Sequence, residues 1–598
     1  MGPNAEHREN EQLVYSQERS KSSTELAQNL QVDLSEIGPN NLTAKEQEAE
    51  DVRMFQGVKA FFCNQYSEAQ DIFAEKADFE PLYALGRGCI SFLKAVTTFN
   101  EDDITLAIKH LSFAEALASA QLHASKPSFT SNVTKFFSGR KHFMTNGQLR
   151  STVIKAESVL LIALIQLFQE SLVSYGKAAL NLRRGYKSYE QVWDEMNKSD
   201  FPGPVDRHTK GGVEFGFGTC NLVLSFLPGK VIKMIAAAIG YRGNKELGVQ
   251  LVNDCLRGRG IRSPLASILF AASYTILTSF VPVILGADYI PKADAYIEDA
   301  LQQFPGSDFF TFFAGRNLRL KRELQKSTVA FKSVNQSLAT GFGAELRRLC
   351  DYELGMNYAL MLEWEAAASC FANLAKEGYW SPAFFTYFQA SCLVMVGKME
   401  EAVKIYSQVA GLVVRKFGGR TILIEQYVTR KVKQYTEEGF KNIVLPGLEI
   451  MLIWNSFGCM TEEILLKCMA MTDAKLSDLE KTDEDISTGK CDVGAMLRLV
   501  KASILNQLKR FSEAHECLTW IFDRDDRIKE DKFVLPFAYW EAGVTAYLKG
   551  NLEKAHGLWE EAGRISGYEF ELRLAFRLHL GIMKLNDLTG KSKGSSLL

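Results

Sequence analysis

Apolar side chains recur along most of this chain at intervals of three and four residues, which is the period of an α-helix. The helical period runs from about Ala44 to Phe99 and again from Ser151 to about Met196. Alternating β-branched runs bounded by turn residues are hard to find, so strand signals are weak. The 14 prolines are sparse within the periodic segments, and proline breaks helix interiors. The pattern predicts an all-α protein.

Polar interruptions divide the pattern into segments. Both ends are rich in polar residues and are predicted to be disordered. The predicted segments are a tail (1–45), N-terminal helical repeats (46–198) with a basic and aromatic insertion (120–148), a central helical region (199–345), middle repeats (346–475), an acidic linker (476–492), C-terminal repeats (493–586) and a second tail (587–598).

Within the helical segments the same spacing of small and bulky residues recurs, as expected for a repeat of 34 residues built from two helices. Such a repeat places a small residue at its eighth position, Ala near the twentieth and a bulky residue at the twenty-fourth. The positions that match are Gly57, Ala69, Phe73 and Pro81; Gly355, Tyr358, Ala367 and Phe371; Ala390, Ala402 and Tyr406; and Gly543, Ala555, Trp559 and Ala562.

Weaker matches occur around Ala502 and Ala293. One match would carry little weight, because small and aromatic residues at helical spacing are common in any core. Several matches spread along the chain predict a tetratricopeptide-like solenoid, in which each helix pair buries its apolar face against its neighbours.

Composition agrees with a soluble repeat protein. The chain of 598 residues exceeds what one compact core accommodates. The formal net charge of −2 gives no overall field that would attract nucleic acid, so none is expected as a partner. The 11 cysteines stand singly without C-x-x-C spacing, which favours a reducing compartment. The polar N-terminal stretch lacks the apolar core of a signal peptide, and we expect a cytoplasmic protein.

No motif predicts catalysis. The stretch "GFGTCN" contains Gly216 and Gly218, but Asn221 stands where a dinucleotide loop needs its third glycine, and no strand precedes it. The following "LPGKV" lacks the hydroxyl residue of a phosphate-binding loop. The eight histidines show no zinc-ligand spacing. The sequence therefore predicts a protein that is not an enzyme and that has no cofactor or metal.

Two stretches raise the alternative of membrane contact. Residues 263–287 contain 25 uncharged residues, interrupted by Pro264 and Pro282, and a buried solenoid helix followed by a turn is favoured over a span. The stretch from Ala116 to Ala156 has no acidic residue, and its basic and aromatic side chains could contact an anionic surface. A mobile insertion is the simpler interpretation there. The candidate contact residues of this stretch are Lys135, Phe136, Phe137, Arg140 and Lys141.

The groove of a helical-repeat protein can bind peptides. Some repeats hold a C-terminal carboxylate with Lys and Asn at the second, fifth, sixth and ninth positions of their first helices. Here the second, fifth and ninth positions carry Phe384, Tyr387 and Ser391 in one repeat, and Phe537, Trp540 and Val544 in another. Carboxylate-clamp binding of chaperone tails is not expected. The four aromatic residues either bind an apolar partner or are covered by the next turn of the superhelix.

Residues 212–252 combine these features with unusual Gly and Pro placement. This segment, "GVEFGFGTCNLVLSFLPGKVIKMIAAAIGYRGNKELGVQLV", resembles the hallmark segment of the tetratricopeptide repeat protein 39 family, which is grouped with a fungal inclusion-body clearance protein. "FFCNQYSEAQDIF" (61–73), "FFAGRNLRL" (312–320) and "VLPGLEIMLIWNSF" (444–457) extend the resemblance to about residues 51–584. The hallmark positions are Gly216, Gly218, Asn221, Pro228, Gly240 and Gly243.

We interpret the hallmark segment as a helix–turn–helix–turn core. Its glycines would let helices approach closely, Pro228 would end the first helix, a short helix would run from Lys230 to Gly240, and Asn244 would cap the next. The chain departs from the family pattern in two places. Lys321 and Ser327 predict a loosely packed repeat after "FFAGRNLRL", and Gly447 stands where Ala is expected.

The resemblance implies a non-enzymatic scaffold or adaptor whose partners are other proteins. It further implies links with protein turnover, with lipid or sterol homeostasis and with lipid-droplet-associated clearance of aggregates. A nuclear location, or a peripheral one on mitochondria or lipid droplets, is a further implication. The alternative is a peripheral or inserted protein of a mitochondrial or lipid-droplet surface.

Overall fold

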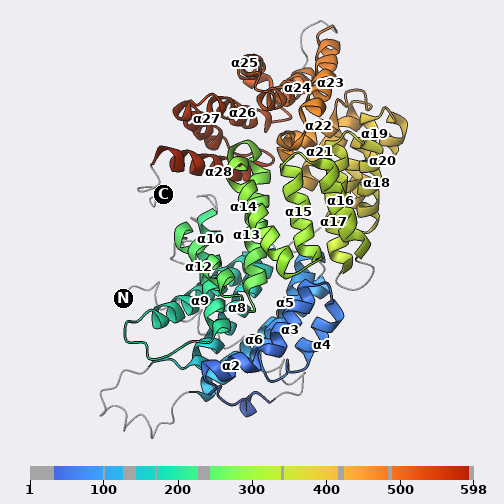
Figure 1. Cartoon of the computed structure of the whole chain (residues 1–598). Helices are drawn as coiled ribbons and strands as arrows, with labels where there is room; N and C mark the ends of the chain where they lie inside the picture. The colour runs from blue at the N-terminus through green and yellow to red at the C-terminus, as the bar shows by residue number, and fades with distance from the viewer. Residues whose placement is uncertain are drawn as a thin grey trace, which may run out of the picture. The chain divides into compact units, whose positions relative to one another are not determined.

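The computed structural model describes residues 33–98, 101–125, 143–168, 172–226, 243–337, 343–414, 423–481 and 488–590. In these ranges the chain forms helices and no strand, which confirms the all-α prediction. Two compact units are present (Figure 1). Of the described residues, unit 1 contains those within 33–226, 243–267 and 304–307, and unit 2 contains those within 268–303 and 308–590.

Unit 1 is built from consecutive helices that pack side by side, as Figure 1 shows for α3, α4, α5 and α6. Its helices are η1 (Leu34–Glu36), α2 (Ala44–Glu50), α3 (Val52–Phe62), α4 (Tyr66–Ala74), α5 (Pro81–Thr98), α6 (Glu101–Ala124), α8 (Asn146–Phe168), α9 (Leu172–Met196), α10 (Arg207–Phe226) and α12 (Lys245–Arg257).

Helix α13 (Ser263–Phe280) begins in unit 1 and continues into unit 2. The first half of unit 2 contains α14 (Pro282–Gln303), α15 (Asp308–Leu320), α16 (Leu324–Ser337), α17 (Gly343–Leu360), α18 (Trp364–Lys376), α19 (Pro382–Met395), α20 (Met399–Tyr406) and η2 (Val409–Leu412). The second half contains α21 (Leu423–Glu437), α22 (Pro446–Trp454), η4 (Phe457–Cys459), α23 (Glu462–Lys481), α24 (Thr488–Gln507), α25 (Phe511–Phe522), η5 (Asp525–Arg527), α26 (Val534–Leu548), α27 (Leu552–Arg564) and α28 (Glu571–Thr589).

The small residue at the eighth position of a repeat lies against the bulky residue at the twenty-fourth. A Cβ atom on Gly57 would approach Phe73 to 2.7 Å, and one on Gly355 would approach Phe371 to 2.7 Å. Gly543 lies in the same way against Trp559. The Ala residues at the twentieth position are fully buried; they are Ala69, Ala367, Ala402 and Ala555.

The remaining repeat positions show the same pattern. Pro81 is the first residue of α5 and is buried. Ala390, Tyr406 and Ala562 are fully buried, whereas Tyr358 is only half-buried. Close helix contact therefore depends on small residues at one position of each repeat, since any larger side chain there would displace the facing ring.

The predicted segment boundaries differ from the observed ones. Helix α6 continues to Ala124 and α8 begins at Asn146, so both ends of the predicted insertion (120–148) belong to helices. Likewise α23 extends to Lys481 and α24 begins at Thr488, inside the predicted linker (476–492). Charged residues such as Asp478 and Glu480 lie on exposed helix surface, where a charge-rich sequence is compatible with helix. Within the predicted N-terminal tail, η1 and the capping residue Thr43 are ordered.

Candidate interaction surface

The hallmark segment forms the crossing of α10 and α12 in unit 1. A Cβ atom on Gly218 would approach Val252 to 3.0 Å, and one on Gly248 would approach the backbone nitrogen of Leu222 to 2.7 Å. Gly216 lies directly against the ring of Tyr189. Close helix approach, rather than phosphate binding, is therefore the role of these glycines.

A buried amide joins the two helices. Asn221 is 2% exposed, donates to the Phe217 carbonyl oxygen at 3.0 Å and accepts from the Asn244 backbone nitrogen at 3.2 Å. Asn244 caps α12 through its side chain, which accepts from the backbone nitrogen of Leu247 at 3.0 Å, as predicted. Gly243 packs against the backbone of Ser225.

Part of the hallmark prediction lies outside the described residues, namely Pro228, Gly240 and the short helix from Lys230 to Gly240. Within the described part, Leu222 is buried but Val223 is 42% exposed. The apolar run that begins at Leu222 is therefore not buried throughout, because successive residues of a helix point in different directions.

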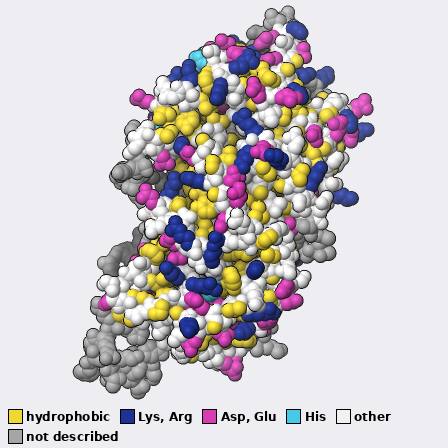
Figure 2. Space-filling model, viewed as in Figure 1, with side chains coloured by type: hydrophobic (Ala, Val, Ile, Leu, Met, Phe, Trp, Pro, Cys, Tyr) yellow, Lys and Arg dark blue, Asp and Glu magenta, His cyan; other side chains and the backbone are white. Residues whose placement is uncertain are grey.

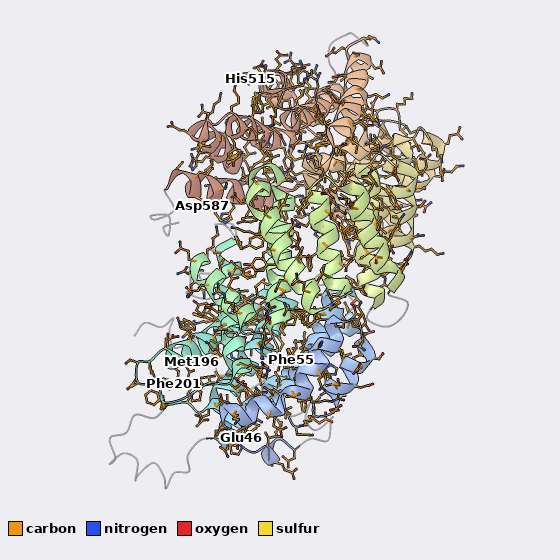
Figure 3. All side chains as sticks on the ribbon, in the orientation of Figure 1. Glu46, Phe55, Met196, Phe201, His515 and Asp587 are labelled. Carbon is orange, nitrogen blue, oxygen red and sulfur yellow. The ribbon has the colours of Figure 1, made fainter. Side chains whose placement is uncertain are left out.

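The core beneath this crossing is a cluster of apolar residues from α8, α9, α10 and α12. Its buried members are Leu149, Val153, Ala156, Tyr186, Tyr189, Val192, Val213, Phe217 and Leu251. Met196 and Phe201, both labelled in Figure 3, are partly buried against it. The hallmark segment is thus a structural element of unit 1.

The groove positions of the middle repeats, in unit 2, are buried. Phe384 is 1% exposed and stacks on Trp454 at a centroid distance of 5.3 Å. Tyr387 is fully buried, and its hydroxyl lies 3.3 Å from that of Tyr435. Helices α21 and α22 therefore cover this part of the groove, so burial contradicts a partner surface at Phe384 and Tyr387 and agrees with the alternative that the chain itself covers them.

The C-terminal repeats show the same result. Phe537 and Trp540 are each 1% exposed. Phe537 lies beneath the guanidinium of Arg577, whose central carbon is 5.0 Å from the ring centroid, and Trp540 stacks on Trp559 at 5.1 Å. These aromatic residues are also packing residues, because α28 and the facing helix α27 cover them.

Helix α22 is the element that fills the middle of unit 2. All of its residues from Pro446 to Ile453 are buried. Gly447 is required here, since a Cβ atom would approach Trp364 to 2.8 Å and Met395 to 2.9 Å. The expected Ala at this position would therefore not fit without displacement.

Helix α22 carries one buried charge, Glu449, which belongs to an ionic network. Lys431 on α21 lies 3.0 Å from Glu449 and 3.2 Å from Asp531. Arg430 lies 3.0 Å from Asp531 and 2.7 Å from Glu569, so its guanidinium links these two carboxylates. The network connects α21 and α22 to residues about 100 positions further along the chain.

Electrostatics support this arrangement. Burial alone would lower the pKa of Lys431, but the carboxylates of Asp531 and Glu449 outweigh it and raise that pKa. Burial raises the pKa of Glu449, with Lys431 opposing. For Asp531 the two cations outweigh burial and hold the pKa below its usual value. Lys431 therefore remains charged between two carboxylates.

Two arginines of α28 lie at the C-terminal end of α22. Arg573 donates to the carbonyl oxygen of Ile453 at 2.9 Å, and Arg577 donates to the same oxygen. Burial lowers the pKa of Arg573 to about 10 and that of Arg577 to about 9. Cations next to the free carbonyl groups of a helix C-terminus are favourable, and this contact fixes α22 in the groove.

The repeat that follows "FFAGRNLRL" is tightly packed, so the prediction of loose packing is wrong. Gly315 on α15 lies against Phe331 on α16, with 2.8 Å from a Cβ atom to the ring. Ser327 is fully buried and donates to the Gly315 carbonyl oxygen at 2.7 Å, while Lys321 pairs with Asp294 at 2.6 Å. The spacing of 16 residues from 315 to 331 is the same as in the other repeats, and it could have revealed this one.

The candidate contact residues of the basic and aromatic stretch lie outside the described residues. They are Lys135, Phe136, Phe137, Arg140 and Lys141. On the face drawn in Figure 2, basic and acidic side chains are interspersed among apolar ones. Among the described residues no group of His, Cys, Asp or Glu is arranged to hold a metal ion.

Helix α13 is the one described helix that is long and apolar enough to cross a membrane. Its 18 residues have a mean hydropathy of 1.3, and 44% of them are buried inside the molecule. A buried core helix meets the same criteria, so length and composition leave both interpretations open.

Comparison with known proteins places this architecture in a family. The model of the Iml2/Tetratricopeptide repeat protein 39 family matches residues 55–508. The chain is 25% identical over 543 residues to tetratricopeptide repeat protein ttc-39B of Caenorhabditis elegans, covering 87% of this chain and 90% of that protein. The fold and the family match together define a helical-repeat protein. This chain belongs to the Iml2/tetratricopeptide repeat protein 39 family.

The chain also matches three solved structures that superpose poorly on it as a whole. Yeast Tom70 is 12% identical with a TM-score of 0.28, and the match covers 92% of this chain and 100% of that one. The APC/C hetero-tetramer Cut9–Hcn1 is 13% identical with a TM-score of 0.22, and the match covers 87% of this chain and 94% of that one. Naa15/Naa10 bound to HypK-THB is 12% identical with a TM-score of 0.25, and the match covers 93% of this chain and 89% of that one.

Proposed function

We propose that the protein is a scaffold that binds other proteins through the outer faces of its helical repeats. The observation that carries the proposal is the recurring contact between a glycine and a ring in successive helix pairs, such as Gly355 with Phe371. This packing builds an array of repeats, and arrays of this type present large surfaces to protein partners. Membership of the family supports the same function.

The proposed binding surface excludes the groove of the middle repeats. Helices α21 and α22 cover that groove, and the network around Lys431 fixes them there. The outer helices, in contrast, expose apolar side chains. Val329 on α16 is 66% exposed and Leu466 on α23 is 44% exposed. Single exposed apolar residues are common on protein surfaces, so Val329 and Leu466 serve here as accessible positions at which the proposed binding surface can be tested.

The test begins with proximity labelling in cells, followed by reconstitution of the recovered partner with the purified full chain. Hydrogen exchange then reports which helices the partner protects. We expect protection on outer helices and weaker binding by Val329→Glu or Leu466→Glu, with the exposed Leu588→Glu on α28 as the matched control. Absence of any stable partner would contradict the scaffold function. Protection from hydrogen exchange confined to α19 and α21 would instead show that the partner displaces α22 from the groove.

Helix α13 supports a second candidate, a protein attached to an organelle or lipid-droplet surface. Its hydropathy and length are the supporting observation. Alkaline carbonate extraction of cell membranes distinguishes the two. Release of the protein into the soluble fraction excludes insertion, whereas retention that is lost in an Ile276→Lys variant supports it; Ile276 is 41% exposed on α13.

Finer roles rest on family resemblance alone. Participation in protein turnover, in lipid or sterol homeostasis or in clearance of aggregates is a proposal of this kind, and so is a cytoplasmic location. The identity of the recovered partner, together with imaging of the full chain in cells, tests both.

A further inference from the structure

Unit 1 contains a cavity of about 70 Å³ beside the first repeat. Its walls come from α3, α4 and α5, from Glu157 on α8, and from residues 261–265, which lead into α13. Apolar side chains form nearly all of the wall, among them Phe61, Phe62, Leu85, Cys89, Ile90 and Leu93. Cys89, Ile90 and Leu93 are half-buried, so this side of the cavity is open to the surface.

The cavity is preformed, because glycine contacts fix the helices around it. A Cβ atom on Gly57 would approach Phe73 to 2.7 Å, and one on Gly86 would approach Met54 to 2.8 Å. Helices α3, α4 and α5 thus cross at the closest distance that their side chains allow. They cannot move together to close the cavity, and ligand sites are commonly preformed in this way.

Two charged groups line the cavity, and they satisfy each other. Arg262 donates from Nε and Nη2 to one carboxylate oxygen of Glu157, at 2.9 and 2.8 Å. Its Nη1 donates to the carbonyl oxygen of His208 at 3.3 Å. Both side chains are at least nine-tenths buried. Among the described residues of the wall, no charge is therefore left to bind a charged ligand.

The apolar character of this wall also determines how water behaves. A buried water molecule needs two to four polar partners, so water that enters from the open side finds few partners here and is readily displaced by a small apolar molecule. Burial raises the pKa of the Cys89 thiol, so the thiol stays neutral and adds no charge.

We propose that this cavity is a binding site for a small, uncharged, non-polar molecule, in which one hydrocarbon ring or a short branched chain occupies the space between α3 and α5. Engineered cavities of about 150 Å³ enclose benzene completely. This cavity is smaller, so a single ring fills it and extends past Ile90 and Leu93 toward the opening. The site is independent of the protein-binding surface proposed above.

Ligand-observed ¹⁹F NMR with fluorobenzene and the purified full chain tests the proposal. We expect saturable binding that 4-fluorobenzoate does not share, since a carboxylate would be buried without a partner. Leu93→Trp fills the open side of the cavity and displaces part of the fluorobenzene ring. The displaced part loses buried apolar surface equivalent to one or two methylene groups, so binding should weaken on the order of tenfold. The matched control is Leu106→Trp, at a 42% exposed position of α6.

A second variant keeps the test valid if Leu93→Trp does not fold. Leu85 is 3% exposed in the cavity wall, and Leu85→Ala enlarges the cavity. This variant should bind isobutylbenzene more tightly than the natural protein does. Absence of saturable fluorobenzene binding would overturn the proposal, as would binding that neither variant changes. If a protein partner protects the cavity and fluorobenzene does not bind, the cavity receives an apolar side chain of that partner. This result would also overturn the proposal.

Discussion

Gly315 on α15 lies directly against the ring of Phe331 on α16, and a Cβ atom on this glycine would be only 2.8 Å from the ring. The same arrangement joins Gly355 to Phe371 in the next repeat. In these two repeats the absence of a methyl group therefore sets how closely the two helices approach each other.

Gly355→Ala should therefore destabilise unit 2. The added methyl group meets Phe371 at 2.7 Å, and overpacking of this kind costs roughly 1–3 kcal/mol. Gly557→Ala on α27 is the control, because nothing lies within 4 Å of its added Cβ atom and Ala favours helix by about 1 kcal/mol over Gly. In thermal unfolding the first variant should lower the midpoint and the second should keep or raise it. Equal effects would contradict the packing role.

Lys431→Met should be strongly destabilising. It leaves the buried carboxylates of Glu449 and Asp531 without their shared cation, and breaking a buried ion pair in this way costs about 3–5 kcal/mol. Lys467→Met removes an exposed pair with Glu463 and should change stability by less than about 1 kcal/mol. Chemical denaturation of both variants is the measurement. A mild Lys431→Met phenotype would show that the network does not fix α22.

The contribution of His208 to stability should fall as the pH drops from about 6.5 toward 4. Burial lowers the pKa of His208 to about 4, so in this window the unfolded chain binds a proton that the folded chain does not, and stability rises with pH. The difference in thermal midpoint between the natural protein and His208→Gln isolates this contribution, and from pH 4.5 to 7.5 it should shift in favour of the natural protein. Replacement of the exposed His515 (Figure 3) by Gln should cause no such shift.

Glu214 should act in the opposite direction. Burial raises the pKa of this carboxyl group to about 7, so the folded chain holds a proton that the unfolded chain releases above its usual pKa of about 4.3. The group therefore lowers stability progressively as the pH rises from about 4.3 to 7. Glu214→Gln should raise the thermal midpoint at pH 7.5 and have little effect at pH 4.5. A gain at pH 4.5 alone would contradict this assignment.

Asn221→Leu should destabilise the hallmark crossing of unit 1. The backbone nitrogen of Asn244 would lose its acceptor, and a buried donor left without a partner costs about 1–3 kcal/mol. Val223→Leu, at a 42% exposed position two residues further on, is the control. If both variants unfold at the same temperature as the natural protein, the amide has no structural role.

Much of the repeat architecture could be predicted from local patterns. The spacing of 16 residues between Gly355 and Phe371 follows from the geometry of two antiparallel helices, and Asn244 precedes its helix in the way that a capping residue does. Such features depend on residues within one repeat, so a single sequence contains them. The same spacing from Gly315 to Phe331 was obscured by Lys321 and Ser327 at positions where small residues were expected.

The aromatic groove positions, in contrast, could not be assigned from the sequence. Phe384 is apolar whether it binds a partner or is covered by the chain, and only the position of Trp454 shows that it is covered. A uniformly apolar helix with one acid, "PGLEIMLIW", was the available signal for a buried element with an ionic partner.

The helices, their pairing within repeats and the family all follow from local sequence patterns. Which side chains are covered depends instead on contacts between distant segments. Lys431 reaches Asp531 across 100 residues, and the apolar cavity of unit 1 collects side chains from α3, α5 and the start of α13. The ion pair and the cavity both depend on how helices from distant parts of the chain pack together. The periodicity of one segment shows which side of its helix is apolar, but it does not show what packs against that side.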